Sequence, residues 1–181
     1  MALEQLRKRW EAMASPLVMG LGRTNPAFLT WLALPVGIAA SLLVLFAPKS
    51  DTGALMLMGS ALLIGFSMIL DGLDGQLARQ TGQVSRWGDY LDHTLDRLLD
   101  AMWIIAIASS PAWVDDPALG WAAAWFTILG SYMGTQAQAV SGGRNYKGFS
   151  RADRTILAIA ALAITGIFWP VSPVFQLTVI P

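Results

Sequence analysis

Long uncharged segments alternate along the chain with short segments that hold nearly all of its charges. No charged side chain occurs over the 21 positions of residues 27–47, the 18 of residues 53–70 or the 27 of residues 117–143. A helix of about 20 apolar residues crosses the hydrocarbon core of a bilayer. The pattern therefore predicts a membrane-spanning helix in each of these three segments.

Two further spans are predicted from less uniform segments. Residues 101–114 are too few to span alone, so we expect them to complete a helix whose earlier turns carry carboxylates that face protein or water. Residues 155–169 form another apolar helix, which Pro170 and Pro173 interrupt. Only residues 174–181 remain for a sixth span, so we expect the last span to be short or truncated.

The amino-terminal residues 1–24 predict an interfacial amphipathic helix instead of a span. Leu3, Leu6, Trp10 and Met13 recur at spacings of three and four, which places them on one helical face. Basic residues accompany them, and the segment has no cleavable apolar core of the kind found in secretory signals.

The composition agrees with a membrane protein, because 55% of the residues are hydrophobic and only 13% are charged. The sequence predicts an all-α integral membrane protein, with a bundle of about six transmembrane helices. No internal repeat divides the chain, so we expect residues 1–181 to form a single domain. Eleven of the twelve basic residues lie on one side of the predicted spans, with Lys49 on the other. The positive-inside rule predicts a multi-pass cell-membrane protein with a cytoplasmic amino terminus.

Four carboxylates gather around the turn between the second and third spans. Asp71 and Asp74 are three residues apart at the end of one helix, and Asp92 and Asp96 are four apart at the start of the next. Each spacing places both side chains on one helical face. A short turn around Gly82 would fold the helices antiparallel and bring the two pairs together.

The gathered acids indicate a metal site that uses oxygen ligands. Cysteine is absent, and His93, the single histidine, is expected to be a packing or helix-surface residue. Converging carboxylates repel one another unless a cation lies between them. Two Mg²⁺ or Mn²⁺ ions about 3.5–4 Å apart would suit phosphoryl transfer on such ligands. In the alternative interpretation the acids only form helix-end ion pairs, namely Asp89, Asp92, Asp96 and Asp100 with Arg86 and Arg97.

The segment from Asp71 to Asp96 resembles the signature of the CDP-alcohol phosphotransferase family, D-x2-D-G-x2-A-R-x8-G-x3-D-x3-D, at every fixed position. The resemblance implies six transmembrane helices, usually in a homodimer, around a polar cavity that opens to the cytoplasm. It implies transfer of a phosphoalcohol from a CDP-lipid donor to an alcohol or phosphorylated polyol, with release of CMP. No nucleic-acid partner is expected.

The same resemblance implies a role for each matched residue. Asp71, Asp74 and Asp92 would hold the metals and the CDP diphosphate, and Asp96, a fourth candidate metal ligand, would be the general base. The nucleotide would lie against Asp74, Gly75, Ala78, Arg79 and Gly88. The family's Pro-Asn-x-x-Thr segment is matched only in part by residues 25–30, where Ala27 replaces the usual asparagine. Asn25 and Pro26 also suit a helix start, so Thr30 is left outside the predicted site.

The acceptor is predicted from the basic segment between the fourth and fifth spans. We expect the cations of this segment to bind the phosphate of the acceptor. These cations are Arg144, Lys147, Arg151 and Arg154. The run from Gly148 to Arg154 resembles the relatives that use inositol phosphate. Such relatives often have a basic pair where this chain has Gln136 and Gln138, so glycerol phosphate remains an alternative. The cations would equally suit binding to lipid headgroups, and diacyl and archaeal ether-linked donors are not distinguished.

Three other classes of function compete with this interpretation. Intramembrane prenyl transfer also uses carboxylates and magnesium, although its aspartate motifs are spaced differently. A divalent-cation channel or carrier would use the acids for selectivity and would not release CMP. A purely structural membrane protein would leave the clustered acids unexplained.

Overall fold

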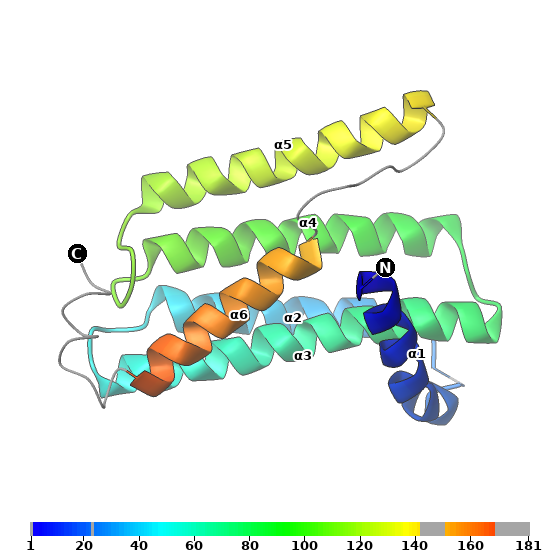
Figure 1. The fold of residues 1–181 in the computed structure, drawn as a ribbon, viewed down its shortest axis with the longest axis horizontal. Helices are drawn as coiled ribbons and strands as arrows, with labels where there is room; N and C mark the ends of the chain where they lie inside the picture. Colours follow the sequence, from blue (N-terminus) through cyan, green and yellow to red (C-terminus); the bar gives the residue numbers. More distant parts are fainter. Residues whose placement is uncertain (1, 23, 142–150, 169–181) are drawn as a thin grey trace.

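The computed structural model describes residues 2–22, 24–141 and 151–168, which form six helices and no strand (Figure 1). The helices are α1 (Ala2–Gly20), α2 (Pro26–Leu45), α3 (Asp51–Thr81), α4 (Arg86–Ser109), α5 (Pro117–Ser141) and α6 (Arg151–Phe168). The all-α prediction is confirmed. The segment 174–181 that was considered for a sixth span lies outside the described residues.

Two of the described helices, α2 and α3, are long and apolar enough to cross a membrane, with mean hydropathies of 2.2 and 2.1. α3 has 31 residues, about ten more than a span requires. Its last three turns, which begin near Asp71, therefore have room to extend beyond the hydrocarbon core. The total of six transmembrane helices stays a prediction.

Local sequence signals fix the ends of the helices that surround the acids. Asn25 caps α2 through a 3.0 Å hydrogen bond from the Ala27 N–H, and Pro26 takes the first position as expected. α3 ends at Thr81 and is capped by Gly82, whose φ of 69° lies in the left-handed region that glycine tolerates best. Ser85 caps α4 by accepting a 3.0 Å hydrogen bond from the Gly88 N–H.

One predicted boundary is wrong. We expected the third span to continue to Val114, whereas α4 ends at Ser109. Pro111 disfavours helical backbone at the preceding residue, and Ser110 accordingly has an extended conformation with ψ of 124°. The chain then turns, with the Asp116 N–H donating to the Ala108 carbonyl at 2.8 Å.

The helices pack around the α2–α3 pair. α4 packs on α2, α5 packs on the outer side of α4, and α6 crosses α3 obliquely (Figure 1). Polar side chains join the inner helices, because Ser60 and Ser67 of α3 donate to the α2 carbonyls of Ala40 and Ala33 at 2.9 and 3.1 Å. Trp103 of α4 donates its indole N–H to the Gly37 carbonyl of α2 at 3.1 Å.

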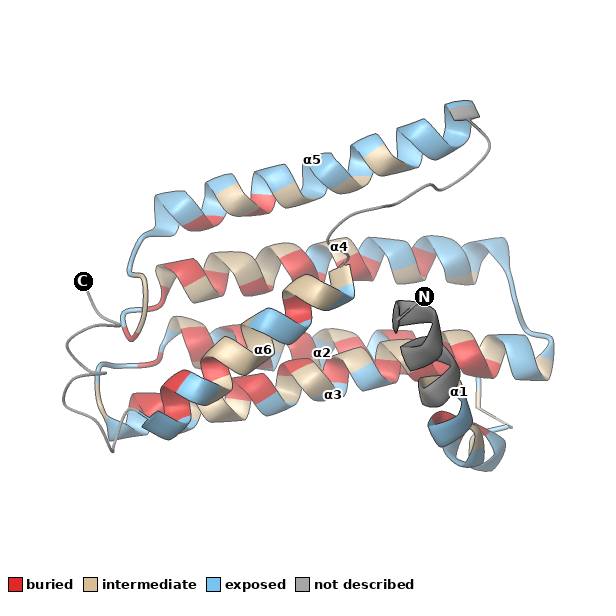
Figure 2. Ribbon diagram, viewed as in Figure 1, coloured by how far each residue is buried: buried red, intermediate tan, exposed pale blue. Residues whose placement is uncertain are grey.

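Burial separates an inner and an outer surface on most helices (Figure 2). The larger core cluster unites α2, α3, α4 and α6 around Leu57, Ile64, Leu99 and Leu162. The outer surface is itself apolar, and on α5 it exposes Trp121, Trp125 and Phe126 by 65%, 66% and 69%. Large exposed apolar areas are rare on soluble monomers, so this surface agrees with contact with lipid.

Candidate metal and nucleotide site

The end of α3 and the start of α4 bring three of the predicted aspartates together. Carboxylate oxygens of Asp71, Asp74 and Asp92 lie within 4.8 Å of one another. The turn at Gly82 produces this arrangement, because it reverses the chain and faces the first pair of acids toward the second. An all-oxygen set at this spacing fits a hard divalent cation, since Mg²⁺ and Mn²⁺ prefer carboxylate ligands.

Asp74 is 5% exposed and receives a hydrogen bond from the Thr30 hydroxyl of α2. The two residues are 44 positions apart in the chain. The bond fixes one carboxylate oxygen and leaves the other available to a ligand. Thr30 is therefore a site residue that we left outside the predicted set, although the partial Pro-x-x-x-Thr segment contained the signal for it.

A cavity of about 480 Å³ adjoins these acids. The start of α2, the end of α3, the turn and the first turns of α4 form its walls. Its lining includes every predicted nucleotide residue, namely Asp74, Gly75, Ala78, Arg79 and Gly88. Ser85 and Trp87 also line it and were not predicted as site residues. Trp87 stacks with Tyr90 at a centroid distance of 5.5 Å, which gives the cavity an aromatic edge.

The amino-terminal helix reaches this cavity through Arg79. The Arg79 guanidinium lies 3.8 Å from the Glu11 carboxylate of α1. The buried Gln76 amide donates to the Glu11 backbone carbonyl at 2.9 Å, which ties the same turn of α1 to α3. The amino-terminal helix thus contacts Arg79, a residue of the cavity lining, from outside the cavity.

Arg151, the first residue of α6, contacts three aspartates from two helices. Its Nη1 lies 3.0 Å from Asp71, its Nη2 lies 2.8 Å from Asp96, and its Nε lies 2.9 Å from Asp100. Only 18% of the Arg151 side chain is exposed. The arginine therefore balances much of the negative charge that the acids concentrate here.

The other predicted acceptor cations are distributed differently. Arg154 lines a smaller cavity of about 50 Å³ beside Asp100 and Thr155. Arg144 and Lys147 lie outside the described residues. Because Arg154 and Arg151 are three positions apart, they leave the first turn of α6 close together, as the sequence suggested.

Ion pairs of the kind expected from the structural interpretation also exist. Arg97 lies 3.4 Å from Asp96 and 3.9 Å from Asp100, and it donates to Ser131 of α5 at 2.9 Å. These pairs involve Asp96 and Asp100. The oxygen set also contains an ion-paired member, because Asp71 contacts Arg151.

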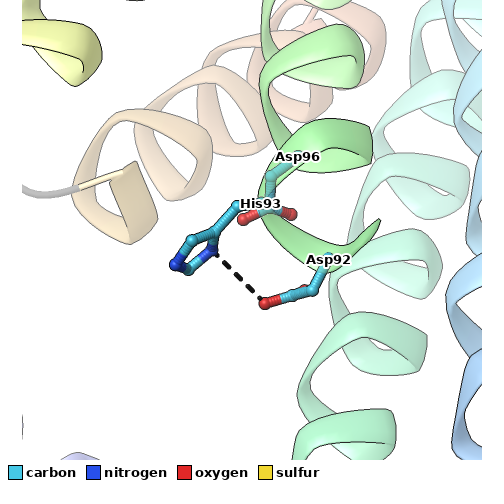
Figure 3. Close-up of side chains that lie close together, drawn as sticks. All are labelled: Asp92, His93 and Asp96. Atoms are coloured by element: carbon cyan, nitrogen blue, oxygen red, sulfur yellow. Dashed lines mark ion pairs between the residues drawn. The ribbon is translucent and has the colours of Figure 1, made fainter. Parts of the chain in front are cut away.

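His93 lies on the helix surface, one of the two places expected for it, with 48% of its side chain exposed. Its Nδ1 is 3.6 Å from Asp92, and the side chain of Asp96 lies beside these two on the same helix (Figure 3). Its Nε2 is 3.8 Å from Asp89. Asp92, His93 and Asp96 thus form a second group with ligand atoms within 4.8 Å, but its mixed donors suit a hard cation less well than the all-oxygen group.

Comparisons with known proteins extend over this whole arrangement. A protein-family model described as CDP-alcohol phosphatidyltransferase matches residues 23–180. The phosphatidylinositol phosphate synthase of Cutibacterium acnes is 30% identical over 174 residues, which cover 91% of this chain and 79% of that protein. The archaetidylinositol phosphate synthase of Pyrococcus horikoshii is 42% identical over 74 residues, 41% of this chain and 36% of that protein. The inner membrane protein YnbA of Escherichia coli is 26% identical over 160 residues, 87% and 77% of the two chains.

Proposed function

Because the chain belongs to the CDP-alcohol phosphatidyltransferase family, we propose that this membrane enzyme transfers a phosphoalcohol from a CDP-lipid to inositol phosphate. The observation that carries the proposal is the all-oxygen group of Asp71, Asp74 and Asp92 at the edge of the 480 Å³ cavity. The cavity offers space for a nucleotide, and the acids lie where its diphosphate would enter. Donor and cation sites are thus adjacent.

The cavity residues have clear binding tasks under this proposal. Gly75 and Gly88 have no side chain and Ala78 has only a methyl group, so a nucleotide can approach the backbone of α3 and α4. Arg79 supplies a planar donor fork for a phosphate of the donor. Thr30 orients the Asp74 carboxylate from the opposite wall.

The proposed reaction has one proton transfer and one substitution at phosphorus, in which a phosphoester bond forms and a phosphoanhydride bond breaks. The acceptor hydroxyl oxygen forms a bond to the β-phosphorus of the CDP-lipid, and the bond between that phosphorus and the CMP oxygen breaks. Asp96 takes the hydroxyl proton as general base. It is 8% exposed and lies next to Arg151, so its basicity is set by burial and by that cation.

The family is metal-dependent, and Asp71, Asp74 and Asp92, with Asp96 as a fourth candidate ligand, would hold Mg²⁺ or Mn²⁺. When bound, two such ions would neutralise charge on the diphosphate and on the departing CMP. The residues shown to lie within 4.8 Å fit that requirement in both donor type and spacing.

The proposed acceptor follows from the place of Arg151. Its guanidinium touches Asp96, so a phosphate held by Arg151 would bring the rest of a small acceptor close to the base. Two relatives named for phosphatidylinositol phosphate and archaetidylinositol phosphate synthesis support inositol phosphate. Arg154, Arg144 and Lys147 would complete the phosphate site.

Glycerol phosphate is a second candidate acceptor. Arg151 recognises a phosphate ester and not the polyol that carries it, so the contacts described here admit both compounds. We also propose a multi-pass arrangement with a cytoplasmic amino terminus and site, supported by the one-sided basic residues. The homodimer is proposed from family resemblance alone.

The experiment that tests the function measures CMP release by the purified protein with a CDP-lipid and Mg²⁺ or Mn²⁺. Inositol phosphate, glycerol phosphate, inositol and serine serve as acceptors in parallel. We expect acceptor-dependent CMP release with inositol phosphate, abolished in Asp96→Asn and kept in Asp51→Asn, an exposed acid at the opposite end of α3. If the folded, cation-bound protein releases no CMP with any acceptor, the proposal fails.

A further inference from the structure

Asp100 is a buried carboxylate outside the signature that identifies the family. It lies on α4 four residues after Asp96, so both acids project from the same helical face. Only 6% of Asp100 is exposed. Its Oδ1 accepts a 2.9 Å hydrogen bond from Arg151 Nε, while its Oδ2 lies 3.9 Å from Arg97 Nη1 and has no hydrogen-bond partner among the described residues.

The three Arg151 contacts differ in what their aspartates have to do during a reaction. Under the proposed function, Asp71 serves the cation and Asp96 accepts the proton of the acceptor. Both must exchange the arginine for another partner when substrates bind. Asp100 has no such task, so its contact with Arg151 Nε can persist while Nη1 and Nη2 are released.

Because a guanidinium is planar, the contact that persists at Nε can orient the two Nη groups that are released. Nε and the two Nη groups lie in one rigid plane, so a carboxylate that fixes Nε also restricts the direction of the Nη donors. The freed Nη1 and Nη2 are then oriented toward the volume between Asp71 and Asp96, where an acceptor phosphate would accept two hydrogen bonds.

Stability alone gives a weak reason for an acid at this position. Burial of two charges costs desolvation, and replacement of a buried ion pair by apolar residues often leaves stability unchanged or higher. Asp100 also keeps one buried oxygen without a hydrogen bond. An orienting role accounts for the acid better than a contribution to folding does.

We propose that Asp100 is a positioning residue that holds Arg151 by its Nε and aims the two Nη groups at the phosphate of the acceptor. This inference rests on the proposed function, because it requires a phosphorylated acceptor. It assigns Asp100 to recognition of the acceptor and gives it no part in binding the CDP-lipid.

The test compares the steady-state kinetics of the full-length Asp100→Asn variant with those of the wild type in detergent. We expect the KM for inositol phosphate to rise at least tenfold, equivalent to about 1.4 kcal/mol. The kcat and the KM for the CDP-lipid should stay within about twofold, because Asp100 would touch neither the donor nor the reacting atoms. A purely structural role predicts a different result: a lower kcat, a higher KM for both substrates and a lower thermal stability. That result would overturn the proposal.

Two further variants make the outcome specific. Ser110→Ala alters another buried polar residue, at the far end of α4, and should leave the KM for inositol phosphate unchanged. Arg151→Lys keeps the positive charge but lacks the guanidinium, both the Nε that Asp100 holds and the two Nη donors, so it should also raise the KM for inositol phosphate even if Asp100→Asn does not fold. An unchanged KM in Arg151→Lys would overturn the inference.

CMP release by the wild-type protein distinguishes a failure of this inference from a failure of the proposed function. If it releases CMP with neither inositol phosphate nor glycerol phosphate, the proposed acceptor class is wrong and the inference falls with it. If it uses a phosphorylated acceptor and Asp100→Asn leaves its KM unchanged, only the role of Asp100 is wrong.

Discussion

Trp10 of α1 lies directly against Gly72 of α3, where a methyl group added to the glycine would come within 3.1 Å of the indole Nε1. Gly72 is one residue beyond Asp71 and two before Asp74. The absence of a side chain at position 72 therefore lets α1 pack beside the acid cluster, where Gln76 and Arg79 also hold it.

Gly72→Ala should loosen the amino-terminal helix. The added methyl group has to displace the indole, so we expect faster amide hydrogen exchange in α1 and a several-fold loss of CMP release. Gly65→Ala is the matched control, because a methyl group there meets no atom within 4 Å. Equal exchange rates in α1 for the two variants would contradict the proposed tight contact.

Thr30→Val should weaken catalysis by removing the hydrogen bond to Asp74. A hydrogen bond to a charged group contributes about 1.5–3 kcal/mol, which corresponds to roughly a 10- to 100-fold loss of activity. We also expect the Mg²⁺ concentration for half-maximal activity to rise. Thr30→Ser keeps the hydroxyl and should retain most of both properties; if it behaves like Thr30→Val, the hydrogen bond is not the cause.

Glu11→Gln should have only a small effect on the KM for the CDP-lipid donor. The Glu11 and Arg79 side chains are 35% and 56% exposed at a separation of 3.8 Å, and pairs of this kind contribute less than about 1 kcal/mol. We expect the KM for the CDP-lipid to change by less than about fivefold, and the difference to shrink at high salt. A larger change that persists in salt would show that α1 acts through more than this ion pair.

Mg²⁺ or Mn²⁺ should stabilise the folded protein. A cation that binds only the folded state raises the melting temperature by an amount that grows with the logarithm of its concentration once that concentration exceeds the Kd. We expect a rise for the wild type, little or none for Asp74→Asn, and a normal rise for Asp51→Asn. Thermal melts at increasing cation concentration, with EDTA as the reference, measure the effect.

The helices and the two acid pairs were predictable because their signals are local. Uncharged runs marked α2, α3 and α5, and spacings of three and four placed the acids on common faces. The end of α4 was missed because the apolar run continues past Ser109, although Pro111 stops the helix.

Contacts between distant segments could not be predicted in the same way. Thr30 and Asp74 are 44 residues apart, and Arg151 and Asp71 are 80 apart. Their meeting depends on how α2, α3 and α6 cross, which no local spacing encodes. The sequence therefore led us to predict Arg151 as a phosphate ligand, which stays a prediction, and it did not reveal that Arg151 pairs with the acids.

The long separation between Arg151 and its aspartates has a consequence for biosynthesis. The ribosome completes α3 and α4 before α6, so the nascent chain holds Asp71 and Asp100 before their arginine exists. Docking of α6, at a crossing where Gly166 lies close to Met58, then supplies this charge balance. Gly166→Leu should therefore lower the yield of inserted protein more than the specific activity of the molecules that do fold.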